Sequence, residues 1–120
     1  MERLQSAVAF FGFERPVMEE NNNTQNVWEL FKGEVQEAEE VLQNTDKLAQ
    51  ELPDLLWFIS VLANNSGINL YESFEKKYGR NELKYPSSEF QSGDYNEIMP
   101  RLKQEWKQNG GDEVFYSSLG

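Results

Sequence analysis

The chain has 120 residues with 38% hydrophobic content, which suits one small domain with a core and is short for two. Eleven basic and twenty-one acidic residues give a net charge of −10, which disfavours nucleic acid and anionic membrane partners in the absence of a basic patch. The absence of cysteine and histidine excludes disulfides, thiolate metal sites and a histidine base. Acid–base chemistry would therefore use carboxylates, lysine or tyrosine.

The N-terminal apolar stretch is short, has balanced flanking charges and carries no cleavage signature, so it is not typical of a secretory signal. No run approaches the roughly 18 consecutive apolar residues of a membrane span. We therefore expect a cytoplasmic protein without membrane or nucleic acid partners.

Helical periodicity dominates the first half of the chain. A short amphipathic helix is expected at residues 2–11, and the following stretch, 13–23, predicts a loop because it contains a proline and three consecutive asparagines. Asn23 or Thr24 then caps a long helix that runs to about residue 43. The apolar side of the first helix carries Leu4, Ala7, Val8 and Phe11.

A break at 44–46 separates this helix from a third one, which runs to about Asn65 and is apolar almost all round. Such a helix is buried on several sides, and in so small a chain this implies contact with a second subunit. A fourth helix is expected at 68–80, where Leu70, Phe74 and Tyr78 face inward.

Beyond this point the pattern weakens. We divide the chain into a helical domain at 1–86 and an extension at 87–120, which begins as a loop and contains a short helix at 100–108. The extension is expected to pack as an arm, with its aromatic residues in packing or partner contacts: Trp106, Phe115 and Tyr116.

Two pairs of acids interrupt apolar helix faces. Glu34 and Glu37 are three residues apart on one stripe, and Glu51 and Asp54 repeat that spacing at the edge of the next helix's apolar stripe. Unpartnered buried carboxylates are costly and repel one another, and a divalent cation removes both penalties. Oxygen-only ligands favour Mg²⁺ or Mn²⁺ over zinc. The same acids could instead belong to a solvated helix face or to the start of a helix, where acids are favoured. The pattern alone therefore does not decide between a metal site and a polar helix interface.

Several motifs carry a family resemblance. Asn26, the run G-E-V-Q-E-A at 33–38, the run E-L-P-D-L-L-W-F at 51–58 and the segment 67–86 together resemble the MazG-like all-α nucleoside triphosphate pyrophosphohydrolases. This group includes dCTP pyrophosphatases and is related to dimeric dUTPases, and the match covers about 24–86. The resemblance implies an all-α four-helix bundle completed as a homodimer or a dimer of dimers, with an active site that draws on two subunits.

The resemblance also implies site residues. Four acids would hold Mg²⁺: Glu34, Glu37, Glu51 and Asp54. Four residues of the segment 67–86 would contact phosphates: Lys77, Asn81, Lys84 and Tyr85. Without the resemblance, the two lysines would be taken as surface residues and the tyrosine as a core-edge aromatic. Glu34 or Glu37 is the candidate general base. Trp28 and Phe31 are candidates for a base pocket, although core packing is favoured for Phe31.

Two residues depart from the family pattern. Pro53 stands where a small residue is usual in the family. Within a helix, proline fits without strain only in the first turn. The third helix must therefore start near Gln50 or bend at the proline, and either choice would move Glu51 relative to Asp54. Lys84 stands where arginine is common in the family. A guanidinium group that could donate two parallel hydrogen bonds to a phosphate is thus replaced by an ammonium group, which acts as a point charge.

The implied function is Mg²⁺-dependent hydrolysis of nucleoside or deoxynucleoside triphosphates to the monophosphate and pyrophosphate, as in nucleotide-pool house-cleaning. The alternative is a non-enzymatic helical interaction module with a lapsed metal site. A third hypothesis is the same site acting on another phosphate compound, such as a damaged nucleotide or a phosphoribosyl intermediate.

Overall fold

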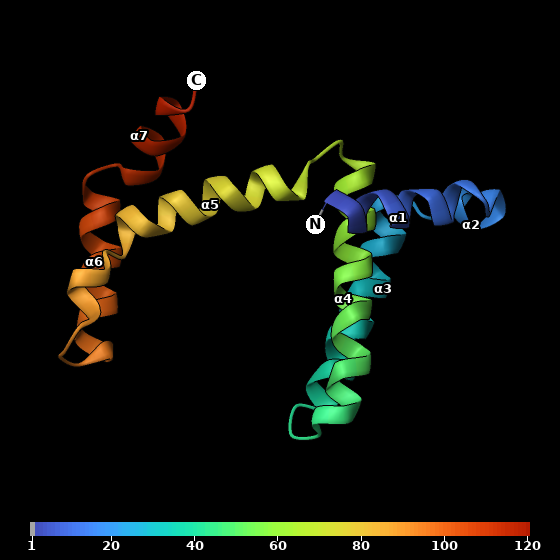
Figure 1. Ribbon diagram of the computed structural model, residues 1–120, viewed down its shortest axis with the longest axis horizontal. Coiled ribbons are helices and arrows are strands. Elements are labelled where there is room, and N and C mark those ends of the chain that lie inside the picture. Colours follow the sequence, from blue (N-terminus) through green and yellow to red (C-terminus); the bar gives the residue numbers. More distant parts are fainter. Residues whose placement is uncertain (1) are drawn as a thin grey trace. The chain divides into compact units, whose positions relative to one another are not determined.

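The computed structural model describes residues 2–120, and this part of the chain is all-helical without strands (Figure 1). The predicted all-α class is therefore confirmed. The helices are α1 (Glu2–Phe13), α2 (Pro16–Glu20), α3 (Thr24–Glu40), α4 (Thr45–Asn65), α5 (Leu70–Lys84), the 3-10 helix η1 (Ser87–Phe90), α6 (Tyr95–Gln108) and α7 (Gly111–Ser118). Contacts divide the chain into two compact units, 1–71 and 72–120, and each is described by itself.

Local capping sets the helix boundaries of the first unit. The side-chain oxygen of Asn23 accepts a hydrogen bond from the backbone N–H of Asn26 at 2.9 Å, and Asn44 caps α4 in the same way. The predicted cap at Asn23 is therefore confirmed, and α4 begins at the predicted break at 44–46. Helix α4 ends before Gly67, whose φ of +66° favours glycine. Helix α3 ends at Glu40, earlier than predicted, because the following residues form the turn into the Asn44 cap.

Other predicted boundaries were wrong. The expected loop at 13–23 contains the short helix α2, which Pro16 begins at the first helical position, where proline fits. Helix α6 begins at Tyr95, ahead of Pro100, because Asp94 caps it through the N–H of Asn96 at 2.9 Å. Helix α4 begins at Thr45 and includes Pro53, so of the two alternatives for this helix the start near Gln50 was wrong.

The first unit is built around the α3–α4 pair, which runs side by side, with α1 packed against α4 (Figure 1). Its buried apolar centre is small and comprises Val8, Val27 and Val61, with Phe58 and Leu62 packed against it. The buried Gln5 side chain accepts a hydrogen bond from the N–H of Leu70 and donates one to the carbonyl of Ile68, each at 2.8 Å. The apolar face predicted for the first helix was thus partly wrong, since Leu4 is 44% exposed.

Large apolar side chains remain exposed on α4 and α5. Leu52, Leu56 and Ile59 on α4 are 51%, 37% and 38% exposed, although this helix was predicted to be buried on several sides. Phe74 and Tyr78 on α5 were expected to face inward but are 54% and 60% exposed. The contacts described within the chain therefore leave these faces uncovered. Within residues 2–120, no helix is long and apolar enough to cross a membrane.

The second unit is held by a partly buried ion pair. Arg80 on α5 donates through Nε and Nη2 to the two carboxylate oxygens of Asp112 on α7, at 2.8 and 3.3 Å. The indole Nε1 of Trp106 on α6 donates to the same carboxylate at 2.8 Å. These bonds lower the pKa of Asp112 to about 2. One carboxylate thus joins three helices.

Candidate functional site

Three acidic side chains converge in the first unit. Glu34 and Glu37 lie one helical turn apart on α3, and Glu51 approaches them from the adjacent α4, so that one oxygen of each lies within 4.8 Å of the others. Glu34 and Glu51 are half-buried, whereas Glu37 is exposed. The fourth predicted acid, Asp54, is exposed and lies outside this group. The structure therefore gathers three of the four predicted ligands.

Two carboxylate oxygens of this acidic cluster lack hydrogen-bond partners in the described part of the chain. Within residues 2–120, the Oε2 atoms of Glu34 and Glu51 are buried and accept no hydrogen bond. Burial raises the pKa of Glu34, and the charges of neighbouring acids, Glu37 first, raise it further. The pKa of Glu51 is raised by burial and then by the charges of Glu37 and Asp54. Buried oxygens rarely lack a partner, so this all-oxygen set fits a hard divalent cation.

The cluster predicts an unusual pH dependence of the metal-free protein. Because the pKa values of Glu34 and Glu51 are raised in the fold, the folded state binds protons more tightly, and this contribution to stability falls as pH rises from 4.5 through the raised values. We expect Glu34→Gln to stabilise the protein at pH 7 and to flatten the fall in its stability as pH rises above 4.5. Urea unfolding midpoints of the variant and the wild type, measured at several pH values in the presence of a chelator, test this expectation.

The control is Glu39→Gln, which makes the same charge change on an exposed position of α3. It removes only general charge repulsion and should leave the pH slope close to that of the wild type. Equal slopes for Glu34→Gln and the wild type would contradict the expectation.

An aromatic pair lies on α3 just before the acids. The rings of Trp28 and Phe31 are stacked, with centroids 5.6 Å apart and an interplanar angle of 27°. Trp28 is 46% exposed and Phe31 is half-buried, so the pair offers an open aromatic surface one turn from Glu34. This surface can accept a planar apolar group.

The predicted phosphate contacts lie in the second unit. Lys77, Asn81 and Lys84 recur along one face of α5, and Tyr85 follows its last turn. The carbonyl oxygen of the Asn81 side chain accepts a hydrogen bond from Nη1 of Arg80 at 3.0 Å, so its amide nitrogen remains a donor. Sequence reasoning missed Arg80, because its partner Asp112 is 32 residues away and no local spacing signals the pair.

One family model matches more than half of the chain. It is described as phosphoribosyl-ATP pyrophosphohydrolase (PRA-PH), and it matches residues 14–81. This range contains α3, α4 and the three converging acids. Neither the curated proteins nor the solved structures gave a match.

Proposed function

Because the chain belongs to the phosphoribosyl-ATP pyrophosphohydrolase family, within the MazG-like all-α superfamily, we propose that it hydrolyses a nucleotide between its α and β phosphates. The products would be a monophosphate and pyrophosphate. The observation that carries this proposal is the facing pair of buried, unpartnered oxygens on Glu34 and Glu51 beside Glu37. Such a cluster favours a cation that a phosphate substrate can share.

We propose Mg²⁺ as this cation, with Mn²⁺ as a substitute, held by Glu34, Glu37 and Glu51. When bound, the cation would polarise phosphate oxygens and offset their charge. Asp54 stays in the proposed set because its charge already acts on Glu34 and Glu51, as their raised pKa values show.

The chain's own residues would share the remaining chemistry. Water attacks phosphorus while the bridging P–O bond breaks, and a carboxylate accepts the water's proton. Glu37 is the proposed base because it is the exposed member of the cluster. Lys77 and Lys84 would neutralise phosphate charge, while Asn81 and Tyr85 would donate hydrogen bonds to phosphate oxygens.

We propose two substrate classes. Trp28 and Phe31 offer a stacking surface for the base of a nucleoside or deoxynucleoside triphosphate. Phosphoribosyl-ATP is the second candidate, favoured by the description of the matching family. Both contain the same α–β phosphoanhydride, so the same site would serve either. The proposed location is the cytoplasm.

We also propose that the chain works as a homodimer or a dimer of dimers. The exposed apolar residues of α4 are of the kind that a bundle buries against another helix pair. A second copy would cover Leu52, Leu56 and Ile59, and it would complete a helical domain at 1–86 to which 87–120 is an extension.

Pyrophosphate release from a substrate panel tests the function. The panel contains canonical and modified nucleoside and deoxynucleoside triphosphates and phosphoribosyl-ATP, each with Mg²⁺, Mn²⁺ or chelator. We expect metal-dependent release of monophosphate and pyrophosphate from at least one member. No release from any member, together with no binding of either metal, would overturn the proposal and favour a helical interaction module.

A further inference from the structure

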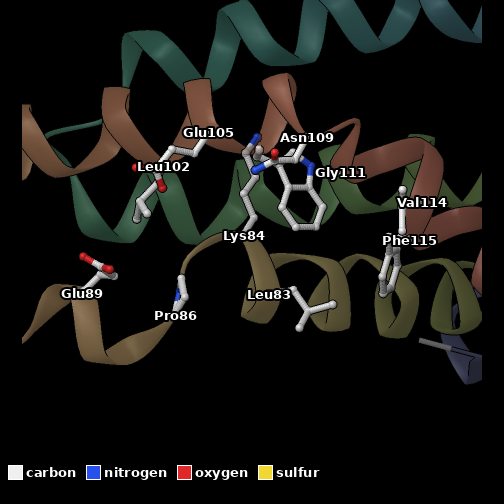
Figure 2. Close-up of a pocket in the computed structure, with 11 residues that line it drawn as sticks. Leu83, Lys84, Pro86, Glu89, Leu102, Glu105, Asn109, Gly111, Val114 and Phe115 are labelled. Atoms are coloured by element: carbon white, nitrogen blue, oxygen red, sulfur yellow. The ribbon is translucent and has the colours of Figure 1, made fainter.

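Two cavities in the second unit share Lys84, Trp106 and Gly111. The first, of about 400 Å³, is lined mainly by apolar residues, and Figure 2 shows Lys84 reaching across it from α5 toward Asn109 and Gly111. The second, of about 350 Å³, is lined by a different mixture in which Lys103 and Lys107 join Lys84. The volume of each is in the range of small-molecule sites.

The charges of the chain are unevenly distributed. Residues 1–71 contain four basic and twelve acidic residues, for a net charge of −8, whereas 72–120 contain seven and nine, for a net charge of −2. Within the second unit, the second cavity concentrates positive charge. Of its two acidic residues, Asp112 is neutralised by Arg80, so only Glu113 opposes the three lysines.

The cluster of lysines is locally unfavourable without a ligand. Lys103 and Lys107 are four residues apart on α6, where like charges repel, and Lys84 adds a third ammonium from α5. In the described part of the chain, neither Lys103 nor Lys107 forms an ion pair. A compact anion with several charges would remove this repulsion and could be contacted by all three ammonium groups.

Hydrogen bonds and close packing fix another part of the cavity's lining. Asp112 fixes the Trp106 indole through Nε1, and Gly111 packs so closely against that ring that a Cβ atom would overlap it. The cavity is therefore bordered by a hydrogen-bonded frame that joins α5, α6 and α7. A preformed cavity lowers the cost of ordering side chains around a ligand.

We infer that Lys84, Lys103 and Lys107 form a binding site for a pyrophosphate group, either free or as part of a nucleotide. Lys103 and Lys107 lie outside the family match, which ends at residue 81. The site shares Lys84 with the proposed phosphate contacts, so its part in hydrolysis rests on the proposed function, whereas anion binding itself does not.

Calorimetric titration of the full chain with inorganic pyrophosphate, in chelator and at low salt, tests the site without turnover. We expect the double variant Lys103→Gln/Lys107→Gln to weaken binding at least about tenfold. The matched control, Lys32→Gln/Lys47→Gln, makes the same charge change in the first unit and should weaken binding less than about twofold.

Two results would overturn the inference: no binding of pyrophosphate by the wild type, or equal losses in the two double variants. A parallel titration with a nucleoside diphosphate separates the two sources of the group. Binding of both compounds identifies the phosphates of a nucleotide, and binding of pyrophosphate alone identifies the released product. Either pattern supports the site, and both hold even if no nucleotide is hydrolysed.

Discussion

The Glu37→Gln variant is expected to lose at least about 100-fold in kcat, the lower end of what a positioned general base contributes. The physical reason is that Glu37 is the exposed carboxylate beside two half-buried ones, so it combines access to water with a place in the proposed ligand set of the cation. The amide keeps the shape of the side chain but neither accepts the proton nor balances a cation. Initial rates on the best substrate of the panel measure this loss.

The control is again Glu39→Gln, which removes one charge from the exposed side of α3 and should keep the rate within about twofold. The fold of Glu37→Gln should be intact, because the substitution relieves repulsion on Glu34 and Glu51. An unchanged rate would contradict the assignment of the base. If Glu37→Gln and Asp54→Asn both stabilise a protein without detectable activity, the helical interaction module becomes the better explanation.

The parts of the fold that sequence predicted well are those governed by local interactions. Asn23 caps α3 through the N–H group three residues ahead, and the predicted break at 44–46 is where Asn44 caps α4. Helix α4 ends at Asn65, as predicted, shortly before Gly67 with its positive φ. Such signals need no knowledge of the rest of the chain. The spacing of Glu34 and Glu37 is local as well, which is why their proximity was predictable.

The parts that failed depend on distant residues. Gln5 is buried because it bonds Ile68 and Leu70, more than sixty residues later, and periodicity placed Leu4 inward instead. Arg80 and Asp112 are likewise far apart in sequence. Hydrophobic periodicity reports that a face is apolar but not what covers it, so Phe74 was predicted to face inward although it is 54% exposed.

The Pro53→Ala variant is expected to raise the free energy of unfolding by about 2 kcal/mol. Proline inside a helix costs about 3 kcal/mol, and its loss returns up to about 1 kcal/mol of entropy to the unfolded chain. Pro53 lies inside α4, well past its start at Thr45, so the full interior cost applies. Urea unfolding at one fixed protein concentration measures the gain, since a dimer's stability depends on concentration.

The same variant decides whether proline damages the proposed metal site. Oxygens of Glu34, Glu37 and Glu51 already lie within 4.8 Å of one another with Pro53 in place, so we expect Pro53→Ala to leave Mg²⁺ affinity within about twofold. Pro100→Ala removes the interior proline of α6 and controls for stabilisation alone. A tenfold gain in Mg²⁺ affinity for Pro53→Ala, absent from Pro100→Ala, would show that the proline holds Glu51 away from the cation. The acidic residues would then form a site that has lost its metal-binding function.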